Sequence, residues 1–209
     1  MAKLLFITLL LSNFLIANSL PNIKQTLPPG MDMLAIKALM VKKPNELEPD
    51  VSIMIGNIFQ NGMQELGVKK NTQKAKIYYK SGAIRGVLIG NLLLANLALE
   101  EKDIKTYIKE MEFIIKANDY KLSIPAGLQL AAFWASINNK KSSIETLIYI
   151  ATIYDDPRAQ FMVGWSITTK EFIPNGMTQD DGQQFLYQAC TNPTRTKEIQ
   201  TQCDKYTNK

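Results

Sequence analysis

The sequence contains no histidine among its 209 residues. This absence excludes Ser-His-Asp and Cys-His catalysis, and it excludes zinc or haem sites that need an imidazole ligand. Phosphate-binding loops of the forms G-x(4)-G-K-[ST] and G-x-G-x-x-G are also missing, as is the Ser-x-x-Lys motif of serine acylation enzymes. We therefore expect a chain with no cofactor or metal and no enzyme activity.

Cysteine is scarce, and its only two residues, Cys190 and Cys203, lie near the C-terminus. Residues 1–19 predict a signal peptide, with Lys3, an apolar run over residues 4–16 and a small-x-small cleavage site over residues 17–19. The run is too short for a membrane anchor, which needs roughly 20 apolar residues. We expect a periplasmic or secreted chain with no stable membrane span after cleavage, in an oxidising compartment.

The charged residues point to ordinary surface roles. The formal net charge is +5, and a lysine cluster surrounds one predicted turn, at Lys69, Lys70, Lys74, Lys76 and Lys80. We interpret this cluster as a solvated face and expect no nucleic-acid partner. Three acidic pairs, at residues 100–101, 155–156 and 180–181, lie at predicted helix boundaries, where carboxylates stabilise helix N-termini. That role is favoured over general acid/base chemistry or calcium binding.

Residues 53–86 predict a helical hairpin. Two apolar blocks, residues 53–59 and 75–83, carry bulky residues at three- and four-residue spacing, so each predicts one apolar helix face. Glycines between the blocks permit a turn, and Asn71 or Thr72 can cap the second helix. Small residues in both blocks allow a close approach of the two helices, with Gly56 and Ala83 as expected contact positions.

This stretch resembles a Sel1-like repeat, a relative of the tetratricopeptide repeat (TPR). The residues that carry the resemblance are Gly56, Phe59, Gly62, Gly67, Val68, Lys74, Ala75, Tyr78, Tyr79, Gly82, Ala83 and Gly86. The gap between Gly62 and Gly67 is wider than the family's usual spacing. The resemblance implies an all-α fold, an α/α solenoid of Sel1/TPR-like helix pairs.

The same pattern recurs along the chain. Gly90 follows Gly56 by 34 residues, a spacing typical of helix-pair repeats, and Gly164 restores the pattern after a third pair centred on Ala132. We expect about four pairs over residues 49–193. Their predicted helices after the first hairpin cover residues 87–93, 104–117, 125–137, 143–154, 159–165 and 180–190. An insertion over residues 118–124 predicts an irregular joint before the third pair.

Capping helices are expected at both ends. Residues 20–48 predict a flexible N-terminus followed by a helix over residues 31–41 that buries Leu34, Leu39 and Met40. Residues 194–209 predict a C-terminal capping helix, because a repeat stack needs a polar outer cover. The chain is expected to be a monomer.

The resemblance implies an adaptor or scaffold that binds another protein in the bacterial cell envelope. An alternative is an envelope enzyme or a cell-wall/β-lactam-binding protein, as in cysteine-rich Sel1 proteins. In the repeat pattern, some positions do not pack in the core of the helical hairpin. We predict that the partner surface is formed by residues at these positions: Asn57, Gln60, Asn91, Phe133, Trp165 and Thr168. For Phe133 and Trp165 the alternative is simple burial between adjacent pairs.

The resemblance also implies a disulfide between Cys190 and Cys203. Cysteine-rich Sel1 proteins place a cysteine at the position of Cys190, but their second cysteine would correspond to Glu198, five residues earlier than here. A helix that starts directly after Pro193 would carry Cys203 too far along its axis for a bridge. The bridge therefore requires an extended loop over residues 191–196 or a last helix that lies across the stack; the alternative is two unpaired thiols.

Overall fold

The protein is described here by a computed structural model that covers residues 32–207. The predicted signal peptide, residues 1–19, and the predicted flexible segment up to residue 29 lie outside the described residues. Ten α-helices and two short 3₁₀-helices form the described part of the chain. The helices pack in sequential pairs, so the predicted all-α helical-repeat fold is confirmed.

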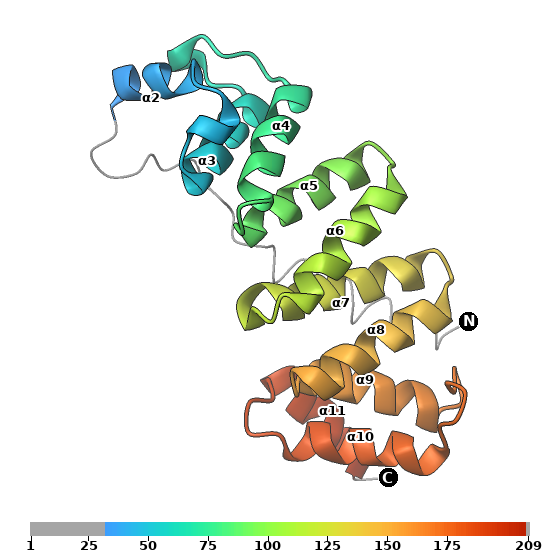
Figure 1. The fold of residues 1–209 in the computed structure, drawn as a ribbon. Helices are drawn as coiled ribbons and strands as arrows, with labels where there is room; N and C mark the ends of the chain where they lie inside the picture. Colours follow the sequence, from blue (N-terminus) through green and yellow to red (C-terminus); the bar gives the residue numbers. More distant parts are fainter. Residues whose placement is uncertain (1–31, 208–209) are drawn as a thin grey trace. The chain divides into compact units, whose positions relative to one another are not determined.

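The chain divides into two compact units at residue 118. The N-terminal unit contains α2 (Met33–Met40), η1 (Pro44–Glu46), α3 (Pro49–Asn61), η2 (Gln64–Leu66), α4 (Thr72–Ala83), α5 (Leu88–Glu100) and α6 (Ile104–Lys116). Within it α3 pairs with α4, α5 pairs with α6, and α4 packs against α5 (Figure 1). These are the first two expected pairs.

The C-terminal unit contains α7 (Tyr120–Ser136), α8 (Lys140–Ile153), α9 (Pro157–Thr168), α10 (Gln179–Thr191) and α11 (Lys197–Thr207). Here α7 pairs with α8 and α9 pairs with α10, while α8 also packs against α9. Most of α9 is buried, including Phe161, Met162, Val163 and Ile167. This helix is therefore the centre of the unit.

One two-residue connection recurs between helices. A residue with positive φ ends one helix and an Asp or Asn caps the next, and the pairs are Lys102-Asp103, Asn118-Asp119, Asn138-Asn139 and Asp155-Asp156. In each pair the second side chain accepts hydrogen bonds from the first turn of the following helix. The left-handed residue also closes the preceding helix: at Lys102 the next amide, Asp103 N, donates to Ala98 O at 2.8 Å.

Close packing of the first hairpin depends on Gly56. A Cβ added to Gly56 would lie 2.5 Å from Cε1 of Tyr79, whose side chain is fully buried. Gly90, the equivalent residue one repeat later, instead meets α4, because its added Cβ would lie 2.9 Å from Tyr79 O. Ala83 is buried as well. Gly56 is thus a close-contact position of the hairpin, as predicted, whereas Ala83 meets the next pair: its amide nitrogen lies 3.0 Å from the Cβ that would be added to Gly90. Gly90 therefore serves the contact between successive pairs.

The N-terminal capping helix is present but buries a different residue. Ile36 is fully buried, and Leu39 and Met40 are partly buried against the same core, whereas Leu34 is 77% exposed. The prediction for Leu34 was wrong, because the helix turns its Ile36 side toward the core.

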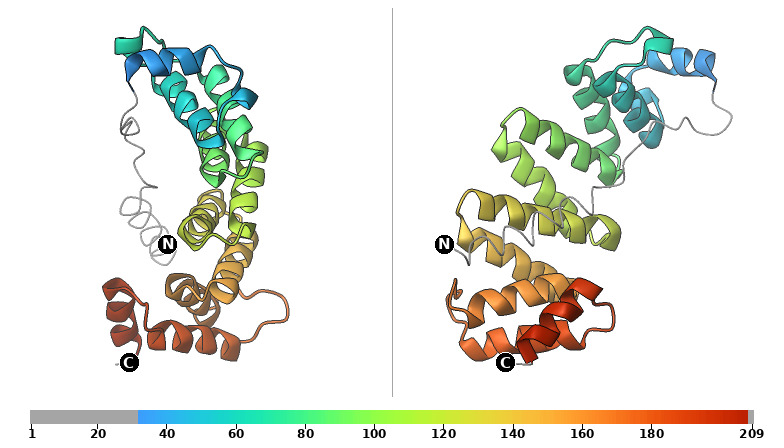
Figure 2. Two further views of the ribbon diagram at one scale, coloured as in Figure 1. Left: turned by 60° about the vertical axis from the view of Figure 1, so that its left-hand side comes forward. Right: turned by 180° about the vertical axis from the view of Figure 1, so that it is seen from behind.

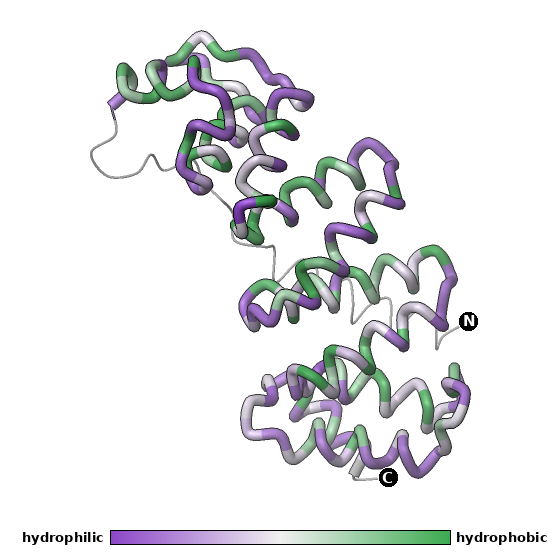
Figure 3. The backbone as a smooth tube through the Cα atoms, viewed as in Figure 1, coloured by the Kyte–Doolittle hydropathy of each residue, from purple (hydrophilic) through white to green (hydrophobic). Residues whose placement is uncertain are grey.

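Helix α5 is hydrophobic along most of its length, as Figure 3 shows. None of the helices between residues 32 and 207 combines the length and the apolar character that crossing a bilayer requires.

The predicted irregular joint over residues 118–124 was also wrong. Helix α7 begins at Tyr120 and contains Pro125 in its interior. Asp119 Oδ1 accepts from Lys121 N at 2.9 Å and from Leu122 N at 3.2 Å, and Ser123 is fully buried. This capped and packed first turn outweighs the one main-chain hydrogen bond that proline removes.

The C-terminal cap carries the disulfide. Cys190 in α10 and Cys203 in α11 are bonded, with their Cα atoms 5.6 Å apart. The geometric condition stated above is met because α10 ends at Thr191 and α11 does not begin until Lys197. Helix α11 then packs against both α10 and α9, and the right-hand view of Figure 2 shows it lying across them. Ile199 and Cys203 join Phe161, Leu186 and Ala189 in one apolar cluster.

Replacing Gly56 with leucine should overpack the first hairpin. The added carbons meet the Tyr79 ring, and we expect the free energy of unfolding to fall by about 1 to 3 kcal/mol. The measurement is thermal or urea unfolding followed by circular dichroism. Gln73→Leu, on an exposed face of α4, is the control and should change stability by less than about 0.5 kcal/mol. An unchanged melting temperature for Gly56→Leu would contradict the contact.

Replacing Lys102 with glycine should stabilise the chain. Lys102 has φ +62°, a conformation that disfavours side chains with a Cβ, so we expect a gain of about 0.5 to 1 kcal/mol. Asn118→Gly is the matched control, since Asn118 has φ +58° but asparagine tolerates this region. Its effect should be smaller. Urea unfolding compares the two, and an equal or reversed order would contradict the assignment.

Reducing the disulfide should lower the free energy of unfolding by about 2 to 3 kcal/mol, because a short closed loop is released in the unfolded chain. Unfolding is measured with and without dithiothreitol. The double variant Cys190→Ser/Cys203→Ser is the control and should not respond to the reductant. Thiol titration of the denatured, unreduced protein should find no free thiol, and two reactive thiols per chain would refute the bridge.

Candidate functional site

Three of the predicted partner residues lie in the N-terminal unit, and their side chains are engaged there. Asn57 is buried, and its Oδ1 accepts from the Tyr79 hydroxyl at 2.7 Å. The same hydroxyl contacts Gln60 Oε1. Burial raises the pKa of Tyr79, so the hydroxyl keeps its proton. Asn91 is buried and donates through Nδ2 to Glu110 Oε2 at 2.7 Å.

The other three lie in the C-terminal unit. The ring centroids of Phe133 and its neighbour Trp134 are 5.6 Å apart. Trp165 stacks on Phe161 with a centroid separation of 6.1 Å and packs against the apolar cluster that contains the disulfide. Thr168 Oγ1 donates to Gly164 O at 2.8 Å. Since the six residues belong to two units, the predicted surface stays a prediction.

The acidic pairs have unequal roles. Residues 100–101 lie at the C-terminal end of α5, not at a helix N-terminus, so the predicted capping role was wrong for that pair. Glu101 instead forms an ion pair with Lys76 of α4. Asp156 caps α9, and Asp181 occupies a capping box with Thr178 at the start of α10.

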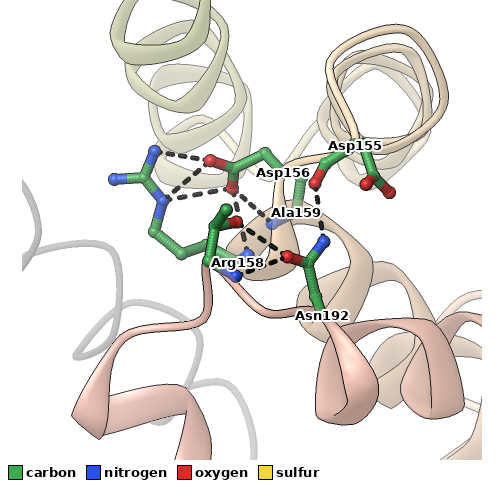
Figure 4. A network of polar contacts seen from close by, with 6 residues as sticks. Asp155, Asp156, Arg158, Ala159 and Asn192 are labelled. Atoms are coloured by element: carbon green, nitrogen blue, oxygen red, sulfur yellow. Dashed lines mark hydrogen bonds and ion pairs between the residues drawn. The ribbon is translucent and has the colours of Figure 1, made fainter.

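The start of α9 is held by a polar network around Asp156 (Figure 4). Asp156 is 6% exposed. Its Oδ1 accepts hydrogen bonds from two main-chain amides, Arg158 N at 3.0 Å and Ala159 N at 3.1 Å. Its Oδ2 accepts a hydrogen bond from the side chain of Arg158, with Nη2 at 2.6 Å. The buried carboxylate is therefore both paired and hydrogen-bonded, as a buried charge must be. This network fixes the direction in which α9 leaves its connection.

Asn192 ties the end of α8 to the end of α10. It is buried, and its Nδ2 donates to Asp155 O at 3.0 Å, as Figure 4 shows. Its Oδ1 accepts from Thr194 N at 2.9 Å, which orders the loop that leads to α11. Its cross-link has no local signal, because Asp155 lies 37 residues earlier in the chain.

These contacts border a groove of about 430 Å³, which we call the α9 groove. It is lined by Ala151, Thr152 and Asp155 at the end of α8, Gln160 of α9, Met177 of the following loop, and Asp181, Gln184, Phe185 and Gln188 of α10. Figure 1 shows α8, α9 and α10 as neighbours, and α9 packs against both of the others. The volume is in the range typical of ligand sites.

Gln160 is the buried polar residue of this groove. It is 1% exposed, and its Nε2 donates to Asp155 Oδ1 at 2.5 Å. A carboxylate only accepts hydrogen bonds, so the amide nitrogen must face Asp155 and the carbonyl oxygen must face away. That oxygen, Oε1, has no hydrogen-bond partner within the described residues. An unpaired buried acceptor destabilises a fold by about 1 to 3 kcal/mol.

The groove is acidic. Asp155 and Asp181 are its only charged lining residues, and neither forms an ion pair within residues 32–207. Hydrogen bonds from the amide and hydroxyl of Thr178 hold the pKa of Asp181 below its usual value, which keeps this carboxylate ionised at neutral pH. The remaining lining combines three glutamine amides with the apolar surfaces of Phe185 and Met177.

A second, smaller hollow lies at the other end of α9. Its volume is about 50 Å³, enough for a few water molecules, and its lining includes Ile144, Leu147 and Glu171. Glu171 Oε2 has no hydrogen-bond partner among the described residues, while Oε1 lies 4.0 Å from Lys140 Nζ. Its size makes it a weaker candidate than the α9 groove.

The α9 groove has a mixed lining of polar and apolar groups. It presents carboxylates, amides and apolar surface, and no cluster of three or more metal-ligating side chains occurs between residues 32 and 207. No periodic pattern in the sequence marks the groove, because its residues come from three helices and a loop. Comparison of the chain with models of protein families, with curated proteins and with solved structures found no match.

Proposed function

We propose that this chain is an exported Sel1-like repeat adaptor of the bacterial cell envelope that binds another protein and does not act as an enzyme. The observation that carries the proposal is the α9 groove, a hollow of about 430 Å³ that is lined by carboxylates, amides and apolar side chains. Surfaces that combine hydrogen-bonding groups with apolar side chains are typical of sites that bind another protein.

The sequential helix pairs support the family assignment. Gly56, Tyr79 and Ala83 are buried where two helices meet, and these are the positions on which the resemblance to the Sel1 pattern depends. Repeats of this kind present extended side-chain surfaces that bind protein segments. The α9 groove offers such a surface within the fourth pair and is open to amides, carboxylates and apolar side chains alike.

The disulfide supports export. A bond between Cys190 and Cys203 persists in an oxidising compartment such as the periplasm and is rare in a reducing cytoplasm. It also joins α11 to α10, so export and the folding of the C-terminal cap are linked.

Site-directed photocrosslinking in the source cells tests the proposal. A benzoylphenylalanine at position 184 or 188, both in the α9 groove, should crosslink to one defined protein in the envelope fraction. The controls are positions 183 and 187, which are exposed on the same helix but do not line the groove. They should give at least fivefold less of that product.

Two results would contradict the proposal. Equal crosslinking from all four positions would show that the groove is not the contact surface. Hydrolysis of cell-wall fragments, or covalent capture of a β-lactam, by the purified wild-type chain would favour the enzyme alternative instead.

A further inference from the structure

The chain contains two Asn-Gly steps, at residues 61–62 and 175–176, and each continues with a methionine, Met63 and Met177. In such a step the main-chain nitrogen of glycine can attack the side-chain carbonyl carbon of asparagine, because glycine has no side chain that hinders the approach. The asparagine must be able to rotate about its main-chain bonds for the two atoms to meet. Since the local sequence is the same at both steps, only the fold can make them differ.

The first step is held at the end of a helix. Asn61 is the last residue of α3, and its Nδ2 donates to Asn57 O at 3.1 Å. Gly62 N donates to Ile58 O at 2.9 Å. Asn61 cannot rotate to meet Gly62 N unless the last turn of α3 opens and both hydrogen bonds break. The fold therefore protects Asn61 from this attack.

The second step lies in the loop between α9 and α10. Asn175 and Gly176 are exposed, and Gly176 has φ +83°. One main-chain hydrogen bond closes the turn around them, from Met177 N to Pro174 O at 3.1 Å. Within residues 32–207, neither the side chain of Asn175 nor Gly176 N has a hydrogen-bond partner. Because a turn held by one hydrogen bond opens more readily than the hydrogen-bonded end of α3, Gly176 N is available for the attack.

We propose that Asn175 is a modification site at which the chain deamidates spontaneously, whereas Asn61 is protected. Gly176 N loses its proton and bonds to Asn175 Cγ, while the bond from Cγ to Nδ2 breaks and the nitrogen leaves as ammonia. One water molecule then opens the cyclic imide. Attack of water on Cγ gives aspartate, and attack on the main-chain carbonyl carbon of residue 175 gives isoaspartate, in which the main chain runs through Cγ. No atom is oxidised or reduced.

The reaction changes the loop that leads to α10. Both products place a negative charge at position 175, which is neutral in the unmodified chain. Isoaspartate also lengthens the main chain by one carbon inside the turn, so it disturbs the hydrogen bond from Met177 N to Pro174 O. Met177 lines the α9 groove, and the modification therefore reaches that surface. The inference does not depend on the adaptor function.

The test incubates the full mature chain in mildly alkaline buffer and follows both steps by peptide mass spectrometry. Digestion with pepsin at low pH avoids reaction during the preparation. The peptide that contains Asn175 should first lose the mass of ammonia and then show the mass gain of an amide converted to a carboxylic acid. We expect this conversion to be at least tenfold faster than at Asn61, and to accelerate with pH because the attacking nitrogen must lose its proton.

Two controls separate the fold from the sequence. In guanidinium chloride the two steps should react at similar rates, because neither is then held by hydrogen bonds. Asn175→Gln should abolish the mass gain in its own peptide, because glutamine would have to form a larger ring, and it should leave the rate at Asn61 unchanged. Should this variant fail to fold, the comparison of Asn61 and Asn175 within the wild-type chain decides alone.

Equal rates at Asn61 and Asn175 in the folded chain would overturn the inference, as would an Asn175 that reacts only in guanidinium chloride. A rate difference that persists in the denatured chain would also overturn it, because the fold would then not be the cause. The photocrosslinks from positions 184 and 188 are measured separately, so the failure of this inference and the failure of the adaptor function are distinguishable.

Discussion

The close approach of α9 and α10 is the contact on which the C-terminal unit depends. A Cβ added to Gly164 would lie 2.7 Å from Gly182 O and from Leu186 N, so at this point the helices meet almost backbone to backbone. Gly182 is equally confined from the other side, because its added Cβ would lie 2.7 Å from Cγ2 of Ile167. Two facing glycines let the helices share an interface that any side chain would separate.

That approach determines where polar side chains can face water. Because one side of α10 is used against α9, the residues on its other sides are exposed or line the α9 groove, as Gln184 and Gln188 do. Asn192 and the disulfide then hold the far end of α10, one through Asp155 O and the other through α11. The groove is thus bordered by elements that are fixed at several points, which favours a pre-formed binding surface over one that must order on binding.

The polar network at the start of α9 and the α9 groove both contain a residue of the adjacent pair Asp155 and Asp156. The adjacent residues Asp155 and Asp156 face in different directions because Asp155 has φ +53°. Asp156 is consequently buried as the N-cap of α9, whereas Asp155 is exposed and accepts the Gln160 amide. One left-handed residue therefore both starts the helix and leaves the Gln160 carbonyl oxygen without a partner among the described residues.

The helices, their pairing and the contact role of Gly56 could be predicted from the sequence, since periodic apolar residues, glycines and Asx caps act within a few residues of one another. Leu34 and the segment around Pro125 could not, because the sequence pattern does not say which side of a helix finds a core or whether packing outweighs a proline. The α9 groove exists only in the tertiary structure and could not be predicted from the sequence. Gln160 in the sequence is one polar residue in an apolar helix, and only the meeting of α8, α9 and α10 buries it, pairs its nitrogen and leaves its oxygen unpaired.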